Sequence, residues 1–271
     1  MRSIQGIQAR AREATEFFMG RPYANGTTGE GTPFSFDSDP LWRLDEFDCT
    51  TFVEAVLAFA TANPSSIDPL SDMENRLREI KYVDGRICFP GRNHFTELHW
   101  IRHLVDDLGI LSDITFDIDP QAQVRSKVLN VANWYRTKHA EIDATFDSDW
   151  SKFVKHAELD AFSPNKSVDP EAKLPFLSLD CLLDPEIQAK IKSYGMVLFN
   201  LIKAEHTKFD IPVIVGHQGF LVVKDDRIYL RHAAVRKQVL DVPLDEYVRE
   251  RQKDTTWPTL GMNLLALVPQ D

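Results

Sequence analysis

The residues best suited to chemistry are one cysteine at a predicted helix start and two histidines in a predicted strand pair. Cys49 follows Asp48, a favourable N-cap, and precedes apolar residues at helical spacing, so we expect a helix over 49–61. Free N–H groups and the positive end of the helix dipole would favour the reactive thiolate there. The alternative is a small buried apolar residue, as free cysteines often are.

The two histidines lie on either side of a predicted two-residue turn, Asp225-Asp226. If 224 pairs with 227, then 217 faces 234, and His217 and His232 become diagonal neighbours on one sheet face. One imidazole could then act as a base while the other fixes its tautomer. An odd-numbered loop would separate them onto opposite faces as ordinary strand residues.

A zinc site formed by Cys49, His217 and His232 is another interpretation of the same residue types. The chain lacks closely spaced ligands and an HExxH-like element, so we do not predict a metal or another cofactor. Cys88 and Cys181 have apolar neighbours and are interpreted as packing residues; a disulfide between them is left open.

Composition limits the class of protein. The chain has 271 residues, 43% hydrophobic and 27% charged, which is typical of a soluble globular protein, and we expect one domain over 1–271. A net charge of −10 argues against nucleic acid as a partner. No apolar run reaches about 18 residues, so no transmembrane segment is expected. The first residues lack the apolar core of a signal peptide, so either the protein is cytoplasmic or a leader has been removed.

The periodicity predicts an α+β fold in which N-terminal helices that carry the cysteine pack on a C-terminal antiparallel sheet, with a mixed insertion at about 110–190. Asp84-Gly85 predicts a hairpin turn, and 163–175 a polar loop with three prolines. Helices are expected over 3–19, 71–79, 96–108, 122–142, 148–158 and 243–252, and strands over 196–202, 212–215, 218–224, 227–235 and 264–268.

Four short motifs, in this order along the chain, resemble those of the NlpC-type cell-wall cysteine peptidases, which are papain-like. They are Gly20-Arg21-Pro22-Tyr23-Ala24-Asn25-Gly26, Phe47-Asp48-Cys49-Thr50, His217-Gln218-Gly219 and His232-Ala233-Ala234. Three further elements are similar to the N-acetylmuramoyl-L-alanine amidase-like branch. These are Thr28-Gly29-Glu30-Gly31, Thr51-Phe52-Val53-Glu54 and Arg92-Asn93-His94-Phe95. Residues 110–190 resemble no family that we can name.

The resemblance implies catalytic roles for three residues: Cys49 as nucleophile, His217 as base and His232 as its orienting partner. It also implies that Tyr23 and backbone near Cys49 stabilise an oxyanion. For Asp48 it implies contact with a substrate amine besides capping of the helix, and the alternative is that Asp48 caps the helix alone.

The same resemblance implies a second group of substrate-binding residues in two loops: Glu30, Arg92, Asn93 and His94. Arg92 and His94 could bind a stem-peptide carboxylate or the lactyl region of the sugar. The structural alternative for Arg92 is an ion pair with an acidic residue of this chain.

The implied partner is peptidoglycan or a muropeptide, cut at the bond between N-acetylmuramic acid and L-alanine. The alternatives are cleavage of the γ-D-glutamyl–diamino acid bond, a non-catalytic peptidoglycan-binding protein, and an acyltransferase that uses the same thioester. We expect export to the periplasm or cell envelope after loss of a leader, with a cytoplasmic role in recycling wall fragments as the alternative. Oligomeric state is not predicted.

Overall fold

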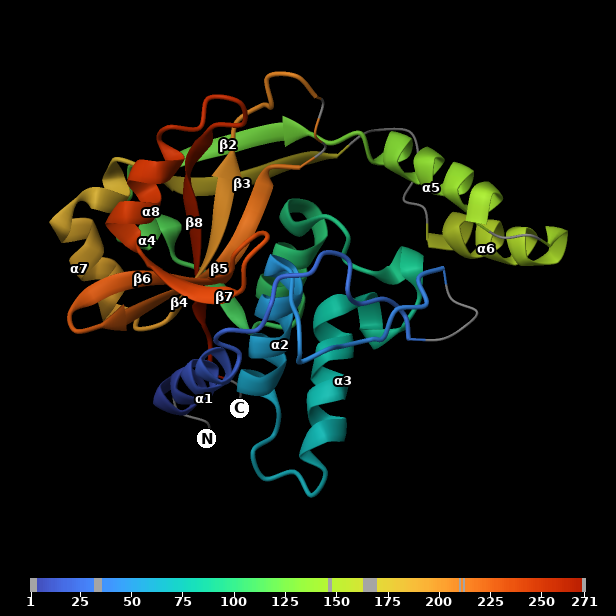
Figure 1. Ribbon diagram of the computed structural model, residues 1–271, viewed down its shortest axis with the longest axis horizontal. Coiled ribbons are helices and arrows are strands. Elements are labelled where there is room, and N and C mark those ends of the chain that lie inside the picture. Colours follow the sequence, from blue (N-terminus) through green and yellow to red (C-terminus); the bar gives the residue numbers. More distant parts are fainter. Residues whose placement is uncertain are drawn as a thin grey trace.

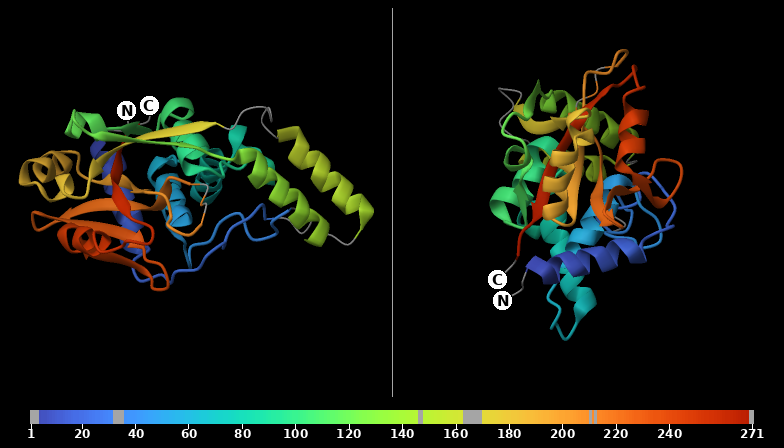
Figure 2. Two further views of the ribbon diagram at one scale, coloured as in Figure 1. Left: turned by 90° about the horizontal axis from the view of Figure 1, so that it is seen from above. Right: turned by 90° about the vertical axis from the view of Figure 1, so that its left-hand side faces the viewer.

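The computed structural model describes residues 4–31, 36–145, 148–162, 170–209, 211 and 213–269. One twisted antiparallel sheet carries helices on both faces, and a pair of helices projects from the body as an arm (Figures 1 and 2). The α+β class predicted from the sequence is therefore confirmed. The helices are α1 (Ile4–Phe17), α2 (Cys49–Thr61), α3 (Pro69–Lys81), α4 (Thr115–Ile118), α5 (Val131–Thr145), α6 (Asp149–Phe162), α7 (Pro185–Ser193) and α8 (Leu244–Arg251).

The sheet has the order β2-β3-β8-β4-β5-β6-β7, with β1 paired to β8, and every pairing is antiparallel. Its long strands are rich in apolar residues on both faces, because helices cover both sides. The strands are β1 (Leu111–Asp113), β2 (Gln123–Val128), β3 (Glu171–Ser178), β4 (Val197–Lys203), β5 (Val215–Lys224), β6 (Arg227–Ala233), β7 (Val239–Pro243) and β8 (Thr259–Leu267).

Two hydrophobic cores lie on opposite faces of this sheet. On one face, Phe52 of α2 meets Phe220 of β5, with ring centroids 5.9 Å apart, and α1 and α3 extend that core. On the other face, Leu244 and Val248 of α8 pack with Phe199 and Leu230 in the second core. Alternation along β5 therefore points Gln218 and Phe220 toward α2, and His217 toward the second core.

Several predicted elements differ from the structure in informative ways. Asp84 and Gly85 form a turn with positive φ angles of 54° and 63°, but the expected hairpin is wrong because residues 80 and 81 complete α3. The expected helix over 122–142 is wrong in its first half, where β2 lies, and α5 begins at Val131. Of the predicted loop over 163–175, residues 163–169 lie outside the described part, and β3 begins at Glu171.

The helix expected over 96–108 is present in extent but contains wide π-type turns over Thr96–Trp100 and His103–Asp107. Gly109, with φ +60°, ends it. The side chain of Glu97 is buried and accepts a hydrogen bond of 2.8 Å from the N–H of Ile214, just before β5. This bond ties the segment to the strand that carries His217.

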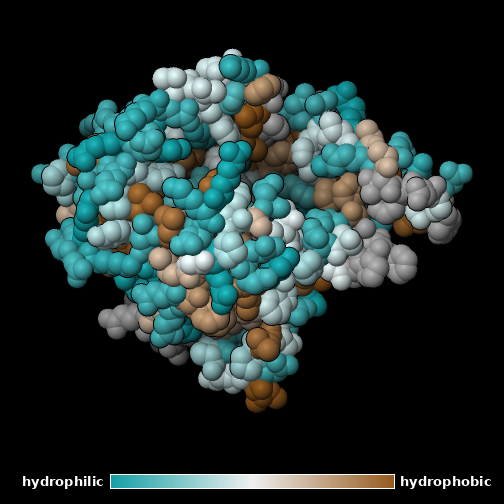
Figure 3. All heavy atoms as spheres, in the orientation of Figure 1, coloured by the Kyte–Doolittle hydropathy of each residue, from teal (hydrophilic) through white to brown (hydrophobic). Residues whose placement is uncertain are grey.

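The arm consists of α5 and α6, which lie side by side and stand away from the sheet in Figure 1 and in the left view of Figure 2. At its base the ring of Trp134 stacks parallel to Phe89, with centroids 6.0 Å apart, and lies 4.7 Å from the ring of His94. The face seen in Figure 3 is mostly hydrophilic, with a recess between body and arm.

Candidate active site

Cys49 is the first residue of α2, and a reciprocal cap fixes its position. The Asp48 carboxylate accepts a hydrogen bond of 2.8 Å from the Thr51 N–H, and the Thr51 hydroxyl accepts one of 3.0 Å from the Asp48 N–H. Such a capping box satisfies two N–H groups that a helix start otherwise leaves unpaired. The predicted helix start is therefore confirmed, and the first turn that carries the sulfur is rigidly held.

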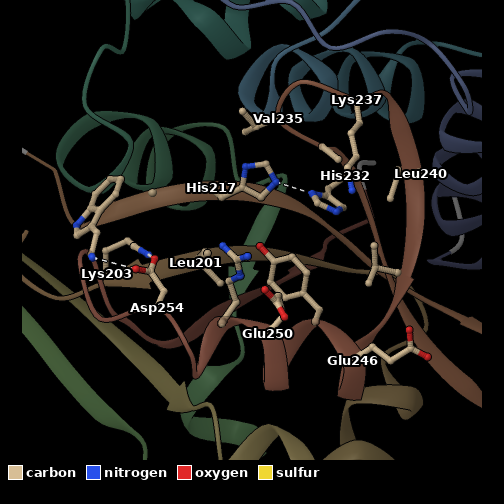
Figure 4. A pocket seen from close by; sticks show the side chains of 16 residues that line it. Leu201, Lys203, His217, His232, Val235, Lys237, Leu240, Glu246, Glu250 and Asp254 are labelled. Atoms are coloured by element: carbon tan, nitrogen blue, oxygen red, sulfur yellow. Dashed lines mark hydrogen bonds and ion pairs between the residues drawn. The ribbon is translucent and has the colours of Figure 1, made fainter.

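The predicted contact between His217 and His232 is confirmed. β5 and β6 pair from Lys224 with Arg227 to Phe220 with Arg231, around a turn in which both aspartates have positive φ. Nε2 of His217 lies 2.6 Å from Nδ1 of His232, and the two rings meet edge to face (Figure 4).

Gly219 makes this contact sterically possible. A Cβ atom at that position would lie 2.8 Å from Cβ of His232 and 2.7 Å from the carbonyl oxygen of Arg231. It would also lie 2.8 Å from Cε1 of Phe199. Only glycine leaves room for the second imidazole beside the strand, which gives a physical reason for the glycine two residues after His217.

The sulfur of Cys49 lies against the same segment of β5. The backbone N–H groups of Gln218 and Thr50 act on the thiol as hydrogen-bond donors. The hydroxyls of Tyr23 and Tyr247 lie near enough to the sulfur for its charge to raise the pKa of each phenol, although burial is the larger cause for both. Tyr247, on α8, also meets the ring of His232 at 5.5 Å. No pattern in the sequence points to this residue.

The protonation states differ from the expectation of a thiolate. Burial, and then the charge of Asp48, raise the pKa of the Cys49 thiol to about 11, and the nearby N–H groups offset this only partly. Burial also lowers the pKa of His217 to about 3 and that of His232 to about 4. The resting site therefore holds a neutral thiol and two neutral imidazoles, and the predicted thiolate is wrong for this state.

Two neutral rings can share this hydrogen bond in either of two directions, which correspond to different tautomers. If Nε2–H of His217 donates to Nδ1 of His232, then Nδ1 of His217 is left as a proton acceptor. His232 then carries its own proton on Nε2, which is buried without a hydrogen-bond partner among the described residues. This tautomer is the one that a general base requires.

Tyr23 is held in place by the turn between β6 and β7 and by the segment that precedes Cys49. Its N–H donates 2.9 Å to the carbonyl of Lys237, and it forms a parallel bridge with Phe47, two residues before the cysteine. The predicted residues Tyr23, Asp48, Cys49, His217 and His232 thus come together in one region.

Glu30 and Arg92 do not join that region. Both form hydrogen bonds that fix the loop over residues 20–31, which we call the glycine-rich loop. The Glu30 carboxylate is buried and accepts a hydrogen bond of 2.8 Å from the Asp37 N–H. The Arg92 guanidinium donates 2.9 Å to the carbonyl oxygen of Thr28, and the ammonium of Lys81 donates 2.9 Å to the Thr28 hydroxyl. The alternative of an ion pair for Arg92 is replaced by these bonds to the loop, and substrate binding by Glu30 and Arg92 stays a prediction.

Asn93 and His94 belong to the support of the arm and of α3. The amide of Asn93 donates 3.4 Å to the Ile80 carbonyl at the end of α3. His94 bonds through Nε2 to the carbonyl of Phe89 at 2.6 Å, and burial lowers its pKa to about 3. With Trp134 against its ring, His94 has a packing role, and a substrate-binding role stays a prediction.

A chain of buried side-chain amides leads from the sheet to the cysteine. Asn263 accepts a hydrogen bond of 3.0 Å from Asn200, and Asn200 accepts one of 2.7 Å from Gln218. Gln218 in turn accepts one of 3.0 Å from the hydroxyl of Thr50, whose oxygen is 4.0 Å from the Cys49 sulfur. The sequence analysis missed this chain, although polar residues that interrupt apolar strands are its signal.

A cavity of about 580 Å³ opens beside the histidine pair, and Cys49 is not among its lining residues (Figure 4). Its walls come from β4, β5, β6, the turn before β7, and α8. The polar and aromatic side chains that line it are Lys203, His217, His232, Lys237, Glu246, Tyr247, Glu250, Arg251, Asp254 and Trp257.

Two further observations concern the described residues. No three side chains of His, Cys, Asp or Glu there group at metal-binding distances, and no helix there has the length and apolar content that a bilayer crossing needs. Cys88 and Cys181 are not joined by a disulfide.

Comparison with known proteins places this geometry in context. Residues 13–256 match the family model described as AmiA-like, N-acetylmuramoyl-L-alanine amidase-like. The crystal structure of a Legionella pneumophila protein is 24% identical with a TM-score of 0.79, covering 97% of this chain and 89% of its own. That of an N-acetylmuramoyl-L-alanine amidase from Bacteroides uniformis is 22% identical with a TM-score of 0.63, covering 97% and 99%. Identities this low show a shared fold alone. No curated protein matches the chain.

Proposed function

Because the chain belongs to the N-acetylmuramoyl-L-alanine amidase-like family, we propose that it is a papain-like cysteine hydrolase of the NlpC type. Its substrate is the amide bond between N-acetylmuramic acid and L-alanine, in peptidoglycan or its fragments. The observation that carries the proposal is the 2.6 Å contact between His217 and His232 on the strand whose Gln218 N–H faces the Cys49 sulfur. In this proposal Cys49 is the nucleophile, His217 the base and His232 the group that orients the base.

In the first step, the Cys49 sulfur attacks the amide carbonyl while Nδ1 of His217 takes the thiol proton. Because the pKa of His217 is low, its imidazolium gives up the proton readily and protonates the leaving amine. His232 holds the ring of His217 and stabilises its positive charge through the existing hydrogen bond.

The developing oxyanion needs donors close to the sulfur. The candidates are the backbone N–H groups in the first turn of α2, which have no partner within the helix, and the Tyr23 hydroxyl. Each donor of this kind stabilises a transition state by about 3–4 kcal/mol. In the second step His217 removes a proton from water, which cleaves the thioester and restores the thiol.

The test is mass spectrometry of purified muropeptides after digestion. The wild type should release the intact peptide with a free N-terminal L-alanine, and Cys49→Ala and His217→Ala should release none. Cys181→Ala, which removes a thiol on the other face of the sheet, is the matched control and should behave as wild type.

Other outcomes would redirect the proposal. Release of a sugar that still carries L-alanyl-D-glutamate would identify a γ-D-glutamyl–diamino acid endopeptidase, and binding without turnover by the wild type would identify a binding protein. Product that appears only when an amine acceptor is added would identify an acyltransferase. Since peptidoglycan lies in the cell envelope, we propose that the protein acts there, and fractionation of cells that express it is the direct check.

A further inference from the structure

The cavity beside the histidine pair is lined by cations that form no ion pair with a carboxylate of the described residues. Its three carboxylates all have partners: Glu246 pairs with Arg227 at 3.2 Å, Glu250 with Lys253 at 2.9 Å and Asp254 with Lys203 at 3.4 Å. Figure 4 shows these acids on one side of the cavity and Lys237 on the other.

Arg251 and Lys237 are the cations that remain. Within the part of the chain that the structure describes, neither has a carboxylate within 4.0 Å. Nε of Arg251 is also buried without a hydrogen-bond partner there. Because a buried donor without a partner costs free energy, this nitrogen is suited to a ligand that accepts a hydrogen bond.

The guanidinium of Arg251 is oriented as well as unpaired. Its Cζ lies 5.4 Å from the ring centroid of Tyr247, a cation–π contact that holds the planar group at the last residue of α8. A guanidinium held in this way offers two parallel N–H groups, which match the two oxygens of a carboxylate.

The same guanidinium lies near the reacting groups. It lines the same cavity as both imidazoles, and its charge contributes to lowering the pKa of His217 and of His232. A ligand held by Arg251 would therefore lie within reach of the bond that Cys49 is proposed to attack.

We propose that Arg251 anchors a carboxylate in the peptide part of the substrate, with Lys237 adding positive charge across the cavity. This inference rests on the proposed function, because it assigns the orientation of a muropeptide at the same site. The N-acetylated sugar and the lactyl group, once joined in the amide, are neutral. The negative charge of the substrate therefore comes from its peptide. Recognition of a carboxylate here would also replace the role first assigned to Arg92, whose guanidinium is bonded to Thr28.

The test compares N-acetylmuramoyl-L-alanyl-D-glutamate with two matched compounds, each of which carries one carboxamide in place of one carboxylate. For the wild type, kcat/KM should fall about 10- to 100-fold with one of the two amides, the range expected of a charge-assisted hydrogen bond. In Arg251→Gln the acid and that amide should be cleaved within about twofold of each other. Arg251→Lys, which keeps charge without the planar fork, should restore part of the preference.

Arg249→Gln is the matched control, since Arg249 lies on the same helix, is exposed and pairs with Asp245 at 3.0 Å. It should keep the full preference. Unchanged discrimination in Arg251→Gln would overturn the inference while leaving the proposed function intact. If the wild type cleaves none of the compounds, the proposed function fails. Calorimetric binding of the same acid and amides to wild type and Arg251→Gln then decides the inference separately.

Discussion

Gly219→Ala tests whether the spacing of the two histidines controls activity. The added methyl carbon would meet Cβ of His232 and Cε1 of Phe199 at 2.8 Å each, and the carbonyl oxygen of Arg231 at 2.7 Å. Carbon atoms pack at about 3.5 Å, so the neighbours must move by roughly 0.7 Å. Overpacking of this kind costs about 1–3 kcal/mol of the free energy of unfolding. A displacement near 1 Å at a catalytic group costs about 100-fold in rate, so we expect kcat/KM to fall about 10- to 100-fold.

The assay pairs steady-state cleavage of a muropeptide with urea unfolding of the same preparations. Gly109→Ala is the control, because Gly109 has φ +60° and no atom within 4 Å of the added carbon. It should lose about 1 kcal/mol through backbone strain and keep its kcat/KM. The reasoning is refuted if Gly219→Ala stays within twofold of wild-type kcat/KM, or if Gly109→Ala loses activity equally.

Three further predictions concern protonation and buried polar groups. His94, His217 and His232 have pKa values of about 3, 3 and 4 in the folded protein, against 6.5 ordinarily. The unfolded chain therefore binds more protons than the folded chain, so the free energy of unfolding should decrease as the pH falls below about 6.5. The slope of this free energy against pH, measured by urea unfolding, should approach the value for an uptake of three protons on unfolding. A slope that corresponds to one proton or fewer would contradict this. Asn200→Leu should lower the free energy of unfolding by about 2–4 kcal/mol, since Gln218 loses the acceptor for its NH2 group and Asn263 loses a donor to its oxygen; a loss under about 1 kcal/mol would argue against the amide chain. Alkylation of Cys49 by iodoacetamide should speed up about tenfold per pH unit between about pH 7 and 9, because the pKa of its thiol is about 11; a constant rate would instead indicate a resting thiolate.

The local geometry of the site could be predicted because it depends on short-range rules. The capping of α2 by Asp48 needs three residues of sequence, and the diagonal contact of His217 with His232 needs a two-residue turn and a period of two. Both aspartates of that turn adopt positive φ angles, 47° and 60°, which keep the register of the pair.

Protonation states and long-range hydrogen bonds could not be predicted from the sequence, because they depend on packing between distant residues. A helix start favours a thiolate, but burial and the charge of Asp48 reverse the effect on the pKa of Cys49. The hydrogen bond of Arg92 to the carbonyl of Thr28 joins residues that are 64 positions apart, so no local pattern predicts it. β7 was missed because five residues with two polar or proline positions carry too weak a pattern.

The attachment of the glycine-rich loop to β7 has a consequence for how a ligand would be received. The Gly20 N–H donates a hydrogen bond of 2.8 Å to the carbonyl of Val239, and the Val239 N–H donates one of 2.8 Å to the carbonyl of Arg21. The loop before Tyr23 therefore continues the sheet beyond β7. The phenol of Tyr23 and the ring of His232 therefore belong to one hydrogen-bonded frame. A ligand that binds between them meets side chains that are already held in their final positions, so little conformational entropy is lost on binding. Discrimination among ligands would then rest on the size and shape of the peptide as well as on its charge, because these side chains would not adjust to a peptide of the wrong size.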